Sequence, residues 1–396
     1  MRHVYFDHQS ATPVLPEVLA AMQPFFRESF GNPSSLHRHG LLARDALAKA
    51  REQIASFIHA ESAEEIIFTS DGTEAMNLAI KGAAHANRRH GNHIIISATE
   101  HPAVLASAQY LETQGFACTR VKVNSEGLIS PSDVAAAITD QTILISVHQT
   151  NHEIGAIQPL REIGNLAHDR GILFYVDAEA AAGWLPTDVQ DCQASLFSFS
   201  PHRFYGPKGV GVLYQNRRAR LTPLIQGGDQ ESARRAGVEN VPSIVGAGVA
   251  ATIAHRELAA RQLHCSRLQA RLWEGLRAKV SHIKLNGPDL GPCRHPANLN
   301  ISTEFIEGES QLLLCDMHGI AVASGSSCVS KAREISHVLG AIGLEPARAR
   351  ASIVLSLGAE NTDEDVDYFL ETFPKVVDKL RTLSPAWADF EKSKNP

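Results

Sequence analysis

The sequence predicts an α/β protein with a mostly parallel sheet in a large domain, followed by a smaller α+β domain at the C-terminal end. Two observations predict this class. Short apolar runs alternate with longer helical patterns through the first two thirds of the chain, and a charged amphipathic stretch then leads away from them. The runs expected to form the strands of the large sheet are 65–69, 93–97, 142–147, 172–177, 195–199 and 209–214.

The smaller domain begins with the amphipathic stretch, which predicts one long helix over about 252–280. Apolar runs at 297–302 and 352–357 predict two strands, and the pattern Thr362-Asp363-Glu364-Asp365 predicts the start of a final helix. We therefore expect a large domain over 14–254 and a small domain formed by 1–13 together with 255–396.

Composition excludes several functional classes. The chain has 396 residues, of which 44% are hydrophobic and 20% charged, as in a folded globular protein. A net charge of -6 argues against a nucleic-acid partner, because phosphate-backbone binding needs a basic excess. No run approaches the roughly 20 apolar residues of a membrane span, and the start MRHVYFDHQS has no apolar core of a signal peptide. We expect a cytoplasmic protein without a membrane partner.

Six cysteines are scattered along the chain without C-x-x-C spacing, which argues against a disulfide framework and a zinc ribbon. Most are expected to be small buried hydrophobic residues. Cys328 differs, because it lies in the small polar run 323–330, which is typical of a loop.

Polar residues gather at or just after the ends of the predicted parallel strands. In open α/β sheets ligands bind at this edge, so we expect a ligand crevice there. The residues concerned are Ser70, Asp71, Glu100, His101, Asn151, His152, Asp177, Ser200 and His202.

Several motifs resemble one protein family along nearly the whole chain. They are GNPSSLH at 31–37, GTE at 72–74, ATEH at 98–101, NHEIG at 151–155, SPHRFYGPKG at 200–209 and SGSSC at 324–328. In order and spacing they resemble the pyridoxal-phosphate (PLP) cysteine desulfurases of the NifS/IscS type, in the class V aminotransferase fold. The resemblance implies the PLP-dependent transferase fold type I, with a seven-stranded sheet in the large domain, and a homodimer.

One departure from this family concerns its central residue. The family forms a Schiff base between PLP and a lysine, and the position that matches is Arg203. A guanidinium stays protonated and cannot act as the amine nucleophile. Lys208 belongs to the same motif, but in the family it coexists with the Schiff-base lysine, so we expect it to point elsewhere. Arg203 is expected to form a structural ion pair with Asp177 or with a bound anion.

Other family positions are changed too. His152 stands in place of an asparagine that supports the cofactor, and Ala180 in place of a glutamine that bonds its ring oxygen. Val238 replaces a threonine that reaches the phosphate from the partner subunit, and Val354 replaces the arginine that binds the substrate carboxylate. Asp71 places a carboxylate just before the phosphate-binding helix. Removing hydrogen bonds to charged groups costs about 1.5–3 kcal/mol each, so PLP chemistry should be hard to sustain.

Some cofactor contacts remain. By the resemblance Asp177 pairs with the pyridinium nitrogen and His101 stacks on the ring, which leaves room for weak, non-covalent PLP binding. The candidate cofactor-binding residues are Gly72, Thr73, His101, His152, Asp177, Ser200 and His202.

No local metal motif is present. A metal ion or an iron–sulfur cluster stays open because imidazole, carboxylate and thiolate groups map to one crevice. The candidate ligands are His101, His152, His202, Asp177 and Cys328.

The functional hypothesis centres on Cys328, with His101 and Arg203 as the other candidate catalytic positions. We expect a desulfurase-like protein whose family activity is absent or very weak, and which acts through Cys328 in sulfur transfer or iron–sulfur assembly. Its partner would be a sulfur acceptor or an iron–sulfur scaffold protein. One alternative is an inactive scaffold or regulator of a true desulfurase. Another is an active PLP enzyme that binds PLP non-covalently or through Lys208.

Overall fold

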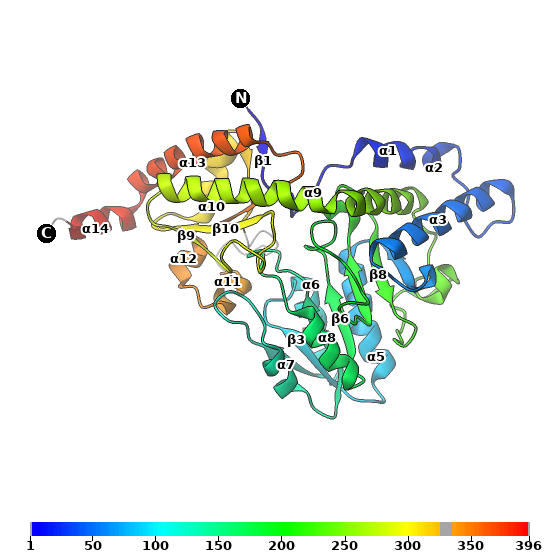
Figure 1. The fold of residues 1–396 in the computed structure, drawn as a ribbon. Coiled ribbons are helices and arrows are strands. Elements are labelled where there is room, and N and C mark those ends of the chain that lie inside the picture. Colours follow the sequence, from blue (N-terminus) through cyan, green and yellow to red (C-terminus); the bar gives the residue numbers. More distant parts are fainter. Residues whose placement is uncertain (1, 325–334, 395–396) are drawn as a thin grey trace.

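A seven-stranded sheet forms the centre of the larger part of the molecule (Figure 1). The structure is a computed structural model that describes residues 2–324 and 335–394. The strand order is β2-β8-β7-β6-β5-β3-β4, and only β8 runs antiparallel to its neighbours. The predicted α/β class with a mostly parallel sheet is confirmed. The strands are β2 (Ile66–Thr69), β3 (His93–Ser97), β4 (Ala117–Val121), β5 (Thr142–His148), β6 (Leu173–Asp177), β7 (Leu196–Phe199) and β8 (Gly211–Gln215).

The inner strands read as unbroken apolar runs because helices cover both faces of the sheet. In β3, Ile95 points into one core, whereas Ile94 and Ile96 point into the other. The edge strand β4 was not predicted from sequence. Its sequence, ACTRV, mixes small, polar and charged residues, and only Val121 is buried, so it has no apolar run to recognise.

Two groups of helices cover the two faces. One core contains residues of α3 and α8, and the other contains residues of α4, η2, α5 and α6. The helices of this part are α1 (Pro16–Met22), α2 (Pro24–Arg27), α3 (Arg38–Phe57), α4 (Gly72–Asn77), the π-helix η2 (Leu78–Gly82), α5 (Ala83–Asn87), α6 (Pro102–Thr113), α7 (Pro131–Ala137) and α8 (Leu160–Asp169). Short 3-10 turns are η1 (Ala63–Glu65), η3 (Pro201–Arg203) and η4 (Gln230–Ala233).

The helix α9 (Val241–Lys279) connects the two parts of the molecule. It begins eleven residues before the predicted start at 252, capped by the Asn240 side chain, which accepts from Ser243 N. Its first half is rich in glycine and alanine and packs on α1 and α3, so it lacks the charged pattern that marks the second half. The amphipathic pattern therefore located only the second half.

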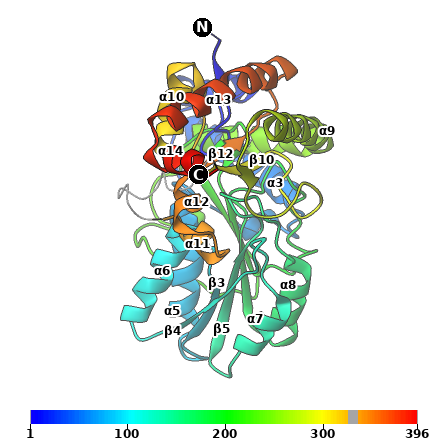
Figure 2. The ribbon, with the colours of Figure 1, turned by 90° about the vertical axis from the view of Figure 1, so that its left-hand side faces the viewer.

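The smaller part contains a three-stranded antiparallel sheet, with α10, α13 and α14 on the side away from the large sheet (Figure 2). The predicted N-terminal cap of the last long helix is confirmed, because Thr362 and Asp365 form a reciprocal capping box. No helix among the described residues is both long and apolar enough to cross a membrane. The elements are β1 (Val4–Tyr5), β9 (Ile283–Leu285), β10 (Asn298–Thr303), β11 (Ile320–Ala321), β12 (Ser352–Ser356), α10 (Gly308–Met317), α11 (His337–Ala341), α12 (Pro346–Arg350), α13 (Asp363–Leu383) and α14 (Pro385–Lys394).

Candidate functional site

The candidate site lies where β3, β5, β6 and β7 end, because the carboxyl ends of parallel strands meet at one edge of the sheet. The segments that follow these strands form two groups of side chains. We call the first the Glu179 corner, made of Gly72, Glu179, Ser200 and Arg203. We call the second the imidazole corner, made of His101, His148, His152, His337, Glu100 and Glu153.

A buried ion pair dominates the Glu179 corner. Arg203 Nε lies 3.8 Å from Glu179 Oε2, and the Glu179 side chain is 7% exposed. Arg203 Nε makes no hydrogen bond to any described residue. The expected partner of Arg203 was Asp177 or an anion, and the carboxylate that the structure pairs with it is Glu179. Glu179 and Asp177 are joined through the backbone, since Glu179 N donates to Asp177 Oδ1 at 2.9 Å.

The second oxygen of Glu179 is held by Ser200. The Ser200 hydroxyl, which is fully buried, donates to Glu179 Oε1 at 2.8 Å. The same carboxylate lies against Gly72, because a β-carbon at Gly72 would collide with Glu179 Oε1. Both carboxylate oxygens are therefore engaged within the crevice.

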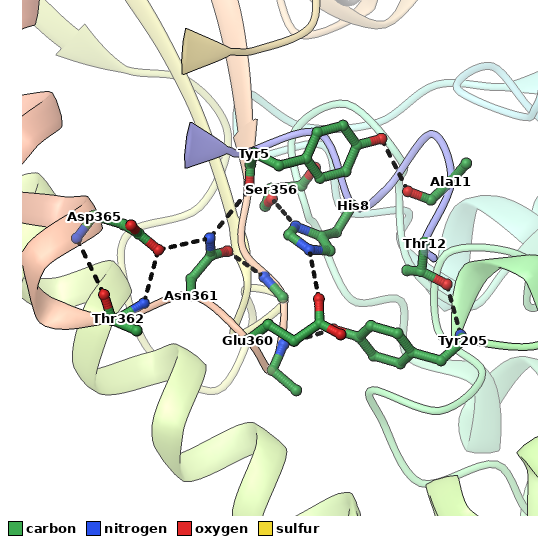
Figure 3. Close-up of polar contacts among 12 residues, drawn as sticks. Tyr5, His8, Ala11, Thr12, Tyr205, Ser356, Glu360, Asn361, Thr362 and Asp365 are labelled. Atoms are coloured by element: carbon green, nitrogen blue, oxygen red, sulfur yellow. Dashed lines mark hydrogen bonds and ion pairs between the residues drawn. The ribbon is translucent and has the colours of Figure 1, made fainter. Parts of the chain in front are cut away.

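The turn that carries Arg203 is fixed on both sides. Thr12 accepts from Tyr205 N at 2.6 Å and donates to His202 O at 2.9 Å, and Trp184 Nε1 donates to Arg203 O at 2.9 Å. Figure 3 shows Thr12 and Tyr205 beside the contacts of His8 with Ser356 and Glu360. The N-terminal segment thus ties the Arg203 turn to the small sheet, and Arg203 has a defined backbone position.

A tight turn positions the side chains of the imidazole corner. Asn151 Oδ1 accepts from Glu153 N at 2.9 Å and from Ile154 N at 3.0 Å, and Asn151 Nδ2 donates to Thr99 O at 3.0 Å. Gly155 closes the turn with a φ of 69°, which favours glycine. This backbone sets His152 next to His101, with ring centroids 5.5 Å apart at an angle of 62°.

Two carboxyl groups accompany these rings. His152 Nε2 lies 3.8 Å from Glu153 Oε1, and Ser336 donates to Glu153 Oε2 at 2.6 Å. His148 Nδ1 lies 3.5 Å from Glu100 Oε1, and His337 Nε2 lies 2.9 Å from Glu100 O. Since Ala103 N donates to His101 Nδ1 at 3.1 Å, the proton of the neutral ring is on Nε2.

Burial suppresses charge in the imidazole corner. Burial, and after it the Arg203 charge, lowers the pKa of His101 to about 4, and burial lowers the pKa of His152 well below its usual range. Burial raises the pKa of Glu153 to about 8 against the Ser336 hydrogen bond. At neutral pH the His101 and His152 rings are therefore neutral and lie beside a protonated Glu153 carboxyl group.

In the Glu179 corner, a nearby cation and a hydrogen bond act against the effect of burial on the carboxylate. Burial raises the pKa of Glu179, and the Arg203 charge and the Ser200 hydrogen bond oppose this effect. Burial and then the Glu179 charge raise the pKa of Asp177 well above its usual range. Burial lowers the pKa of His202 to about 4, and His202 Nδ1 is buried without a hydrogen-bond partner among the described residues.

The remaining predicted positions lie apart from these contacts. Thr73 and Lys208 are exposed, and Val238 is 61% exposed. Val354 is buried in β12, opposite Asn300 of β10. Cys328 lies outside the described residues.

The candidate metal ligands that the structure describes do not gather into a metal site. Within residues 2–324 and 335–394, no group of three or more His, Cys, Asp or Glu side chains could hold a metal ion. The rings of His101 and His152 are in contact, but Asp177 and His202 do not complete a set of ligands with them.

Sequence reasoning did not single out Glu179. The residue lies two positions after Asp177, in the stretch VDAEA, and it meets Gly72 and Ser200 only because β2, β6 and β7 are brought together by the sheet. A carboxylate directly after a strand end was the available signal. Sequence reasoning did not single out Glu231 either. Its buried carboxylate accepts from Arg51 at 2.6 Å through both oxygens.

Known proteins match this chain over nearly its whole length. The model of the aminotransferase class-V family matches residues 4–369. The cysteine desulfurase IscS of Clostridium botulinum (strain Hall) is 46% identical over 393 residues, which cover 99% of both chains. That of Methanosarcina thermophila is 47% identical over 383 residues, 96% of this chain and 94% of the relative.

A solved structure shows the same fold. It is described as a NifS-like protein and superposes with a TM-score of 0.90 at 35% identity, covering 96% of this chain and 100% of its own. Together with the motifs and the crevice at the strand ends, these matches show that the chain belongs to the class V aminotransferase family, among the cysteine desulfurases of the IscS and NifS type.

Proposed function

We propose that this member of the desulfurase family carries sulfur on Cys328 and does not generate it with lysine-bound PLP. Its partner would be a sulfur-acceptor or iron–sulfur scaffold protein in the cytoplasm. The observation that carries the proposal is Arg203, which stands at the Schiff-base position with its guanidinium beside Glu179.

The residues of the crevice do not fit PLP as the family binds it. A guanidinium cannot supply the amine, Ala180 has no amide, and Val354 has no charge for a substrate carboxylate. Lys208 is exposed, which argues against its replacing the missing lysine. No step of the proposed function passes through PLP.

The proposed step is an exchange between a persulfide and a thiol. The Cys328 thiolate attacks the outer sulfur of a donor persulfide, and the donor S–S bond breaks as the new S–S bond forms. The donor leaves as a thiolate and takes up the proton that Cys328 released, so the exchange needs no oxidant. A second exchange of the same kind passes the sulfur to the acceptor.

We also propose that the chain acts as a homodimer. Large apolar side chains are exposed on α1, on α2, before and in α3, and in the stretch 225–238, where a monomer would hold them in water. Figure 1 shows α1, α2 and α3 at the end of the molecule opposite α14. The residues are Leu19, Phe26, Phe30, Leu36, Leu42, Ile225 and Val238, between 42% and 85% exposed.

The same exposed apolar face favours a second candidate function. A chain of this fold could pair with an active desulfurase subunit and regulate it as a scaffold, without any chemistry at Cys328. The two functions differ in one outcome: Cys328→Ser abolishes sulfur carriage but leaves a scaffold effect intact.

The test uses the full-length protein under anaerobic conditions. After treatment with glutathione persulfide, intact-protein mass spectrometry should show one added sulfur atom, which Cys328→Ala removes and the exposed-cysteine control Cys293→Ala keeps. With free cysteine and added PLP, the wild-type protein should release no sulfide and show no borohydride-sensitive Schiff-base band. Cysteine-dependent sulfide release that Cys328→Ala abolishes would overturn the proposal.

A further inference from the structure

The Glu179 corner contains a carboxylate in a position that a bound anion would otherwise take. Glu179 Oε1 accepts the hydrogen bond of the buried Ser200 hydroxyl and contacts Gly72, whose missing side chain leaves the room that the carboxylate fills. Arg203 supplies the positive charge on the other oxygen, at 3.8 Å. This is an anion site whose anion belongs to the chain itself.

Neighbouring donors are also used by acidic side chains of the chain. Ser70 N donates to Glu74 Oε2 at 2.7 Å, and Glu74 N donates to Asp71 Oδ1 at 2.7 Å. Glu74 is held in place by Arg235, whose Nε donates to Glu74 Oε1 at 2.9 Å. An incoming anion would have to displace these carboxylates from donors that they already satisfy.

The electrostatics of the corner point the same way. The Asp71 charge raises the pKa of Glu179, as burial does more strongly, so this region already disfavours one negative charge. A phosphate group carries between one and two negative charges at neutral pH. Arg203, the cation that lies beside this carboxylate, is committed to Glu179.

We propose that Glu179 is a built-in substitute for a phosphate group and closes this crevice to phosphate-bearing ligands, whatever residue stands at position 203. The inference rests on the proposed function, in which the chain does without lysine-bound PLP, and it adds a second, separate barrier. His202 fits this interpretation, because its buried Nδ1 has no hydrogen-bond partner among the described residues, the Glu179 carboxylate included.

The proposal implies that PLP binding through a Schiff base returns only when the residues at positions 179 and 203 are both substituted. Arg203→Lys alone restores an amine but leaves Glu179 on Ser200 and Gly72. Glu179→Ala alone opens the site but supplies no amine. Only Glu179→Ala with Arg203→Lys provides both, so the two changes should be strongly non-additive.

The experiment titrates wild type, both single variants and the double variant with PLP, followed by absorbance and by isothermal calorimetry. We expect the double variant to form a borohydride-sensitive Schiff-base band and to bind PLP ~10- to 100-fold more tightly than Arg203→Lys, as for one regained hydrogen bond to a charged group. Pyridoxal, which lacks the phosphate, is the matched ligand control and should gain less than ~3-fold. Circular dichroism and thermal unfolding confirm that each variant is folded.

Glu179→Gln with Arg203→Lys separates occupancy from charge. The glutamine keeps the volume of Glu179, so it should still exclude PLP; binding equal to that of the alanine double variant would overturn the idea that the side chain fills the site. Saturable PLP binding by Arg203→Lys alone, as tight as in the double variant, would overturn the inference and leave the proposed function standing. A Schiff-base band in the wild type would overturn the proposed function itself.

Discussion

The two corners of the crevice are built at the same edge of the sheet, but only one of them offers a buried carboxylate a cationic partner. In the Glu179 corner a carboxylate keeps an ionic partner, Arg203, and a hydroxyl donor, Ser200. In the imidazole corner burial holds His101 and His152 neutral and raises the pKa of Glu153. The difference teaches that burial penalises charge throughout the crevice, and that an opposite charge and a hydrogen-bond donor oppose this penalty at only one end.

The largest effect is expected from a substitution in the turn that holds the imidazole corner. Asn151→Ala removes three buried hydrogen bonds of the turn beneath His152 and leaves two backbone N–H groups without partners, so it should lower the free energy of unfolding by about 4 kcal/mol. Urea unfolding measures this loss. Asn124→Ala removes two similar bonds at an exposed turn and should cost only about 1 kcal/mol. Equal losses would show that burial of the turn contributes nothing.

The next effect is the acid response of the imidazole corner. His101 has a folded-state pKa of about 4 against an ordinary value of 6.5, so its stabilising contribution is full above pH 6.5 and is lost as pH falls towards 4. The loss should approach about 3 kcal/mol, and His101→Gln should remove it from a series of unfolding curves. The exposed His90→Gln is the control. An unchanged acid slope in His101→Gln would contradict the assignment.

Glu153 should show the opposite dependence. Its folded-state pKa of about 8 lies above the ordinary 4.5, so the stability that it contributes is full below pH 4.5 and is lost as pH rises through 8. Glu153→Gln keeps an acceptor for Ser336 and removes the buried charge. It should raise the free energy of unfolding by about 2 kcal/mol at pH 6, by more at higher pH, and change it little at pH 4. A less stable variant at pH 8.5 would mean that the folded crevice favours the carboxylate.

The smallest effect calibrates the ion pair of the Glu179 corner against one at the surface. Arg120 and Glu112 form two hydrogen bonds of 2.7 and 2.9 Å between largely solvated side chains. Glu112→Gln should therefore cost less than about 1 kcal/mol, and 1 M salt should reduce that cost further. The measurement is thermal unfolding at two salt concentrations. A larger cost that does not depend on salt would show that the Arg120–Glu112 pair is not a weak, screened surface pair with which the buried Arg203–Glu179 pair can be compared.

Sequence reasoning located the sheet well because its strands are buried on both faces. The run 93–97 coincides with β3, and the other predicted strands differ from the observed ones by at most two residues at either end. It missed β4, an edge strand of mixed polarity, and the first half of α9, whose small residues pack closely on α3.

The crevice was predicted in position but not in its contacts. His101 and His152 were expected at one edge and do meet, since they lie four residues after the ends of β3 and β5. The partner of Arg203 could not be read from the chain, because Glu179 reaches Ser200 and Gly72 only after the sheet has placed β6, β7, β8 and β2 side by side. The expected roles of Gly72, Thr73, Asp177, Ser200 and His202 in cofactor binding remain predictions.

The helix α9 contributes side chains to the hydrophobic cores of both parts of the molecule, which couples their stabilities. Its 39 residues span about 58 Å. Ile244 and Ala251 belong to the core under the large sheet, and Leu268 and Leu276 to the core of the small part. We propose that the units 14–254 and 1–13 with 255–396 consequently unfold in one calorimetric transition. Neither unit can lose its core without unfolding part of α9, which both units share.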